Sequence, residues 1–130
     1  MLNDPLAEVR ATLAAEGGSC ARARQMVREA ASSWNLPDDL ADDAQLVVTE
    51  LVSNGIDHAE GPLELTVRRA GSGMFISVRD RSSALPQVRP VDPSSARGRG
   101  MQLVSALSVE WGTEPQPSGK AVWALLDGRG

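Results

Sequence analysis

The sequence predicts an α+β fold, in which a mainly antiparallel sheet carries helices on one face. Two observations carry this prediction. Short segments with alternating apolar residues come in pairs separated by glycine-containing turns, as in antiparallel hairpins. Longer segments repeat their apolar residues every three to four positions, which is typical of amphipathic helices. The chain has 130 residues, and we expect residues 1–130 to form a single domain around one core.

The composition is that of an ordinary globular protein, with 42% hydrophobic and 23% charged residues. No apolar run approaches the ~20 residues of a membrane span, and the first residues do not resemble a signal peptide. We therefore expect a cytoplasmic protein without membrane contact. The single Cys20 excludes an internal disulfide, and no Cys/His cluster suits zinc. A net charge of −4 without a basic block argues against direct nucleic-acid binding.

The first expected elements are an edge strand and a helix. Mixed apolar residues between Leu6 and Ala15 predict the strand. We expect Ser19 to cap the following helix, from Ala21 to Trp34, by accepting a backbone N–H bond. The segment 35–37, Asn-Leu-Pro, then breaks the helix.

The second helix is predicted to start near Leu40 or Asp42, and the rest of the chain is organised around it. At about 100° per residue its apolar residues gather on one side. Its polar residues are expected on the opposite side, where spacings of three and four residues stack them along one stripe: Glu50, Asn54, Asp57 and His58. The helix lacks Lys and Arg, unlike an ordinary solvated face, and a mid-helix Asn costs about 0.5 kcal/mol relative to Ala. Both features indicate a functional stripe.

Two hairpins and a third helix complete the prediction. Alternating residues predict strands at 63–68 and 74–79, with Asp80 at the end of the second. Between Arg81 and Arg99 no periodicity remains, and a loop of this length is usually functional or disordered. The remaining segments are a helix opened by Gly98-Arg99-Gly100, strands at 109–112 and 121–126, and a turn at 115–120.

The segment from Glu50 to Ala59, Glu-Leu-Val-Ser-Asn-Gly-Ile-Asp-His-Ala, resembles the N-box of the histidine-kinase-like (GHKL, Bergerat-fold) ATPase superfamily. The pattern is closest to the bacterial anti-sigma-factor serine kinase branch. The resemblance implies a Bergerat-type two-layer sandwich that binds ATP and Mg²⁺. It makes Asn54 the magnesium ligand and Glu50 the catalytic base, and it places Asp57 and His58 in the nucleotide site.

Gly98-Arg99-Gly100-Met101 at the head of a helix is the second motif. Glycines allow close backbone approach, and free N–H groups at a helix start attract anions. Behind the long loop, the motif resembles the G2 box and ATP lid of the superfamily. The resemblance places these four residues at the phosphates, together with Arg97 in the same loop. It is an equally good interpretation that Arg97 and Arg99 are ordinary arginines of a polar loop and bind no ligand.

Two further positions match the superfamily incompletely. The resemblance makes Asp80 the acceptor of the adenine amine, but Ser82 stands where the motif has Gly, while Pro86 fits the branch. In the last hairpin the branch often has a Thr near adenine, and Ala121 lacks its hydroxyl. One lost hydrogen bond is worth about 0.5–1.5 kcal/mol, so we expect weakened rather than abolished ATP binding.

Three functions follow from these residues. The first is an ATP-dependent serine/threonine kinase that doubles as an anti-sigma factor. By resemblance it would be a homodimer whose partners are an anti-anti-sigma (STAS-type) protein and a sigma factor. The second is a degenerate binding module of the same fold with weak or no ATP turnover. The third, a nucleotide-free enzyme using Glu50, Asp57 and His58 as acid and base, lacks a further identifiable catalytic residue.

Overall fold

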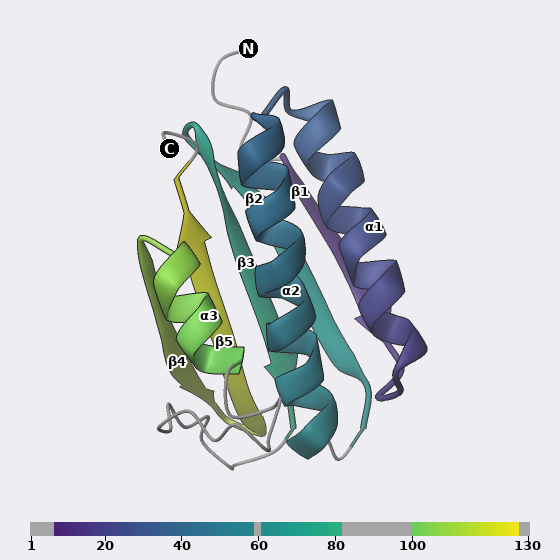
Figure 1. Cartoon of the computed structure of the whole chain (residues 1–130). Helices are drawn as coiled ribbons and strands as arrows, with labels where there is room; N and C mark the ends of the chain where they lie inside the picture. Colours follow the sequence, from purple (N-terminus) through teal and green to yellow (C-terminus); the bar gives the residue numbers. More distant parts are fainter. Residues whose placement is uncertain (1–6, 59–60, 82–99, 128–130) are drawn as a thin grey trace, which may run out of the picture.

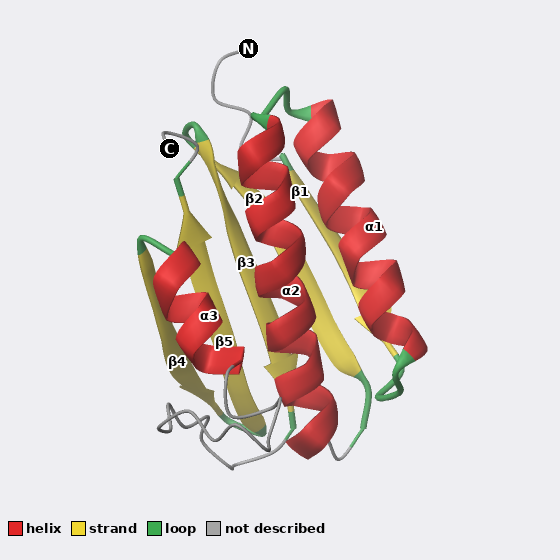
Figure 2. Cartoon of the chain, in the orientation of Figure 1, coloured by secondary structure: helices red, strands yellow, loops and turns green. Residues whose placement is uncertain are grey.

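A computed structural model describes residues 7–58, 61–81 and 100–127. In these residues five strands form one antiparallel sheet in the order β1-β2-β3-β5-β4. Three helices lie side by side over one face of the sheet (Figures 1 and 2). The predicted α+β fold is confirmed. The elements are β1 Glu8–Leu13, α1 Gly18–Ser33, α2 Asp38–His58, β2 Leu63–Ala70, β3 Gly73–Asp80, α3 Gly100–Leu107, β4 Glu110–Gln116 and β5 Gly119–Leu126.

Helix α1 begins at Gly18, three residues before the predicted start. The predicted cap is wrong: the N-cap residue is Gly17, and no side chain caps the helix. Ser19 lies inside the first turn, where its buried hydroxyl donates a hydrogen bond of 2.6 Å to the carbonyl oxygen of Ala14. The hydroxyl therefore connects the start of α1 to the end of β1 instead of accepting from the helix backbone.

Helix α2 spans 21 residues and begins at Asp38, earlier than Leu40 or Asp42. Asp38 and Asp39 occupy the first turn, where the positive end of the helix dipole favours carboxylates. Figure 1 shows α2 across the middle of the sheet, with α1 on one side and α3 on the other. This central position makes α2 the main contributor to the core. None of the helices in the described ranges is both long and apolar enough to cross a membrane.

Along each strand, side chains point alternately to a core face, beneath the helices, and to an open face. Met74, Ile76 and Val78 of β3 are fully buried beneath the helices. The last hairpin is longer than predicted: β4 continues to Gln116, and β5 starts at Gly119, two residues before Ala121. Pairing with β3 extends β5 back to Lys120, opposite Asp80, and pairing with Gln116 of β4 extends it to Gly119.

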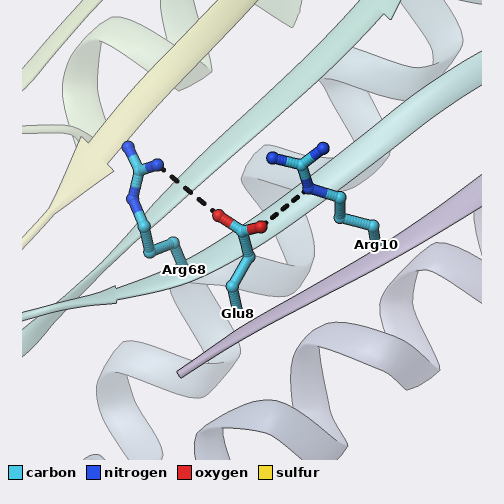
Figure 3. Close-up of polar contacts among 3 residues, drawn as sticks. All are labelled: Glu8, Arg10 and Arg68. Atoms are coloured by element: carbon cyan, nitrogen blue, oxygen red, sulfur yellow. Dashed lines mark hydrogen bonds and ion pairs between the residues drawn. The ribbon is translucent and has the colours of Figure 1, made fainter. Parts of the chain in front are cut away.

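The open face carries charged and aromatic side chains. Glu8 accepts from Arg10 at 2.7 Å and lies 3.6 Å from a guanidinium nitrogen of Arg68 (Figure 3). The Arg68 guanidinium also lies 4.5 Å above the ring of Phe75, which stacks on Trp123 with ring centroids 5.9 Å apart. Exposed ion pairs of this kind contribute little to stability, so the fold depends on the face beneath the helices.

Candidate functional site

The polar stripe of α2 does not lie opposite the core, so that part of the prediction is wrong. The outward position is taken by Leu46, which is 50% exposed. At 3.6 residues per turn, Asn54 and Glu50 lie about 100° and 140° from the sheet-facing Gly55, beside the fully buried Val47. The core arc of α2 is broad because the helix packs against both the sheet and α3. The stripe therefore runs along the border of the core.

The two flanks of α2 have different partners. On one flank, Thr49 accepts a hydrogen bond of 3.2 Å from Arg24 of α1, and Ser53 lies 3.5 Å from the Cys20 sulfur. On the other flank, the Glu50 carboxylate lies against Gly100, the first residue of α3. The predicted base and the predicted phosphate-binding helix start are thus brought together, although they are 50 residues apart in the sequence.

Gly100 lets the Glu50 carboxylate approach the helix start closely. A Cβ on this buried residue would stand 2.6 Å from Oε2 of Glu50, which is closer than real Cβ atoms come to other atoms. Partial burial also raises the pKa of the Glu50 carboxyl above its ordinary value of 4.5, because desolvation disfavours the charged form. A carboxylate with a raised pKa is a better proton acceptor, as a general base requires.

Asn54 carries an unsatisfied polar atom. Its Nδ2 is buried and has no hydrogen-bond partner in the part of the chain that the structure describes. A buried, unpaired amide is costly, which indicates that another group meets it in the functional state. Rotating the amide by 180° exchanges the nitrogen with Oδ1, the kind of oxygen that Mg²⁺ prefers. The residue therefore fits a magnesium ligand.

The other two residues of the stripe differ from this pair. Asp57 is exposed, and His58 is the half-buried last residue of α2. Within the described ranges, no group of three or more His, Cys, Asp or Glu side chains is arranged to hold a metal ion. The structure brings Glu50 against Gly100, and Asn54 lies one helical turn from Glu50 on α2.

Asp80, the predicted acceptor of the adenine amine, lies in a buried ion pair. Nζ of Lys120 is 3.1 Å from Oδ2 and 3.3 Å from Oδ1, so it donates to both carboxylate oxygens. The two side chains are 1% and 2% exposed. Figure 1 shows the ends of β3 and β5 that carry this pair at the same end of the sheet as the start of α3.

Ala121 does not lie with Asp80. It pairs with Arg79, so its side chain belongs to the open face, whereas Asp80 and Lys120 share the core face. Sequence reasoning missed Lys120, although a signal was present. Lys120 is in phase with the buried residues of β5, Val122, Ala124 and Leu126. Starting the strand at Ala121 hid that phase.

The remaining predicted residues belong to the loop and the start of α3. Met101 is 5% exposed and part of the core, so only its backbone is left for a ligand. Pro86, Arg97, Gly98 and Arg99 lie outside the described residues, as do Ser82 and all of the predicted lid except Arg81.

Comparisons with known proteins agree with the observed fold. The sequence model of the histidine kinase-like ATPase domain matches residues 13–125. Among solved structures, the chain is similar to the RsbU and RsbW domains of Rv1364c from Mycobacterium tuberculosis, with a TM-score of 0.71 and 17% identity. The similarity covers 92% of this chain and 32% of that one, so this chain spans about a third of that protein's length. No curated protein matches significantly.

Proposed function

Because the chain belongs to the histidine kinase-like ATPase domain family, we propose that it is an ATP-dependent serine/threonine kinase acting as an anti-sigma factor. The observation that carries the proposal is the convergence of three features. The Glu50 carboxylate lies against Gly100 at the head of α3. One helical turn further along α2 lies Asn54, whose Nδ2 has no hydrogen-bond partner among the described residues. A base, a magnesium ligand and a helix start for phosphate are the parts that phosphoryl transfer needs.

Glu50 acts on the acceptor hydroxyl in this proposal. Its carboxylate accepts the serine proton as the serine oxygen attacks the γ-phosphorus and the bond to the bridging oxygen breaks. The partial burial that raises the pKa of Glu50 favours this proton transfer. Gly100 leaves room for the carboxylate at the helix start, where free N–H groups also favour phosphate oxygens.

Asn54 holds the magnesium ion through its amide oxygen. When bound, the ion would neutralise negative charge on the phosphates. With the amide rotated, its oxygen would take the buried position at which Nδ2 has no partner among the described residues, and the ion would bind there. Asp57, His58, Arg97, Gly98 and Arg99 are proposed to contact the nucleotide, and Pro86 to belong to the lid that covers it.

The proposed partners follow from the resemblance of the Glu50–Ala59 segment to anti-sigma-factor kinases. The phosphorylated substrate is a STAS-type anti-anti-sigma protein, the inhibited partner is a sigma factor, and the chain acts in the cytoplasm as a homodimer. The shared fold with a protein described as containing an RsbW domain supports this assignment. The proposed partners need no contact with nucleic acid or membrane.

A titration with Mg-ATP and a phosphate-transfer assay test the function. The wild-type chain should bind Mg-ATP and transfer labelled γ-phosphate to a serine of a STAS protein. Glu50→Gln should bind ATP but lose transfer, while Glu29→Gln removes an exposed carboxylate of α1 and should leave both unchanged. No binding at millimolar Mg-ATP would reject the kinase assignment.

The Asp80–Lys120 pair favours a second candidate, the binding module with weak or no ATP turnover. An acceptor that is already engaged by an ammonium gains less from the amine of adenine. In that case the chain would bind its protein partner with equal affinity in the presence and absence of Mg-ATP. Partner binding measured with and without nucleotide separates the two functions.

A further inference from the structure

The only lysine of the chain is fully buried, which is unusual for this residue type. The other twelve basic residues are all arginines. Lys120 reaches Asp80, the residue to which the family resemblance gives recognition of the base. A nucleotide base at this place would therefore meet a carboxylate beside an ammonium instead of a carboxylate alone.

A lone carboxylate selects strongly among purines. Ionised Asp only accepts hydrogen bonds, so it pairs with the amino group at position 6 of adenine. A 6-oxopurine would present carbonyl lone pairs to that carboxylate, and neither group could donate. Sites built on such pairing reject the wrong partner strongly, because a buried polar group is left unpaired.

The ammonium of Lys120 changes the selectivity between the two purine types. It has three donors and no acceptor, and Asp80 engages its N–H groups through two oxygens at 3.1 and 3.3 Å. At least one N–H remains to meet an incoming acceptor. A 6-oxo group can accept from Nζ, and a 6-amino group can still donate to Asp80. Each of the two purine types thus finds a complementary partner in the pair.

We propose that Lys120 relaxes the base selectivity of the nucleotide site, so that 6-oxopurine and 6-aminopurine nucleoside triphosphates bind with comparable affinity. This inference rests on the proposed nucleotide binding and deepens it. Because both side chains are almost completely buried, a base that reaches them meets them with little competing water. Their donors and acceptors then decide which base is retained.

The test compares Mg-ATP with the inosine triphosphate complex of Mg²⁺ by calorimetric titration of the full chain. The affinities of wild type should agree within about threefold. Lys120→Thr removes the ammonium and introduces a hydroxyl, and it should prefer ATP by about tenfold or more. Lys120→Arg keeps the charge and should retain the relaxed ratio. Selective ¹⁵N labelling of lysine adds a direct readout, because Lys120 gives the only side-chain ammonium signal, which should shift with both nucleotides.

Failure of this inference differs from failure of the proposed function. A wild-type preference for ATP of tenfold or more, or an unchanged ratio in a folded Lys120→Thr, would overturn relaxed selectivity while leaving nucleotide binding established. If neither nucleotide binds to the wild type, the proposed function and the inference are both wrong. Should Lys120→Thr not fold, the wild-type and Lys120→Arg ratios still decide.

Discussion

Gly100 and Glu50 are in such close contact that a single methyl group on Gly100 would stand 2.6 Å from the Glu50 carboxylate. The nearest atom is the far end of a flexible side chain, so the carboxylate can move aside at small cost in stability. We expect Gly100→Ala to lower the unfolding free energy by less than about 1 kcal/mol. It should lower phosphate transfer by about tenfold or more, because the base is displaced.

Transfer rates and urea melts of Gly100→Ala check this prediction. Gly18→Ala is the matched control, since a Cβ at Gly18 in the first turn of α1 meets no atom within 4 Å. Equal transfer rates in both variants would show that the position of Glu50 next to α3 does not matter for the reaction.

Asn54→Ala should separate stability from nucleotide binding. Removing a mid-helix Asn and an unpaired buried amide is expected to raise the unfolding free energy by about 1 kcal/mol. The same change should abolish the rise in melting temperature that Mg-ATP gives to the wild type. Gln45→Ala is the control: it removes an amide that donates to Ala41 on the same helix, and it should keep the Mg-ATP effect. Mg-ATP stabilisation of Asn54→Ala would exclude Asn54 as the magnesium ligand.

Glu50 should make the folded state less stable as pH rises. Burial raises its pKa in the folded state above 4.5, so the folded chain holds this proton more tightly than the unfolded chain. The unfolding free energy contributed by Glu50 is therefore greatest below the unfolded pKa, and it falls as pH rises through the folded pKa. Glu50→Gln should remove this fall and be the more stable protein at pH 7. Urea melts between pH 4 and pH 8 measure it, and parallel curves for the two proteins would contradict it.

The Asp80–Lys120 pair should be strongly coupled. Lys120→Met or Asp80→Asn alone removes one partner of a buried pair, and loss of a partner that strands a buried charge typically costs about 3–5 kcal/mol. The double variant should lose much less than the sum of the two single losses. The exposed pair of Arg79 and Glu64, at 3.2 Å, is the control and should couple by less than about 1 kcal/mol. Additive losses at Asp80 and Lys120 would rule out the strong coupling.

The sequence predicted the order and type of the elements because periodicity depends on burial, and burial decides this fold. The boundaries were less certain. Both helices begin earlier than predicted: α1 follows Gly17, which offers no side-chain cap, and α2 starts at Asp38, directly after Pro37. Glu50 and Asn54 are site residues predicted from their spacing and from the family resemblance.

The surroundings of the site could not be obtained in the same way. Contact between Glu50 and Gly100 depends on how α2 and α3 pack, and no local pattern encodes that packing. Ala121 pairs with Arg79, one residue from the position opposite Asp80, and in a strand one residue exchanges the two faces. The burial of Lys120 could be recognised only once the true start of β5 was known.

The cross-strand pairing of Asp80 with Lys120 also bears on how the chain reaches one folded structure. A slip of one residue between β3 and β5 would set Asp80 opposite Gly119 or Ala121 and move Lys120 out of its partner's reach. A buried carboxylate without its ammonium would then destabilise the slipped arrangement by several kcal/mol. The same slip would also turn the buried Val122 and Ala124 toward the open face. The ion pair therefore penalises wrong strand alignment during folding, whatever ligand the finished protein binds.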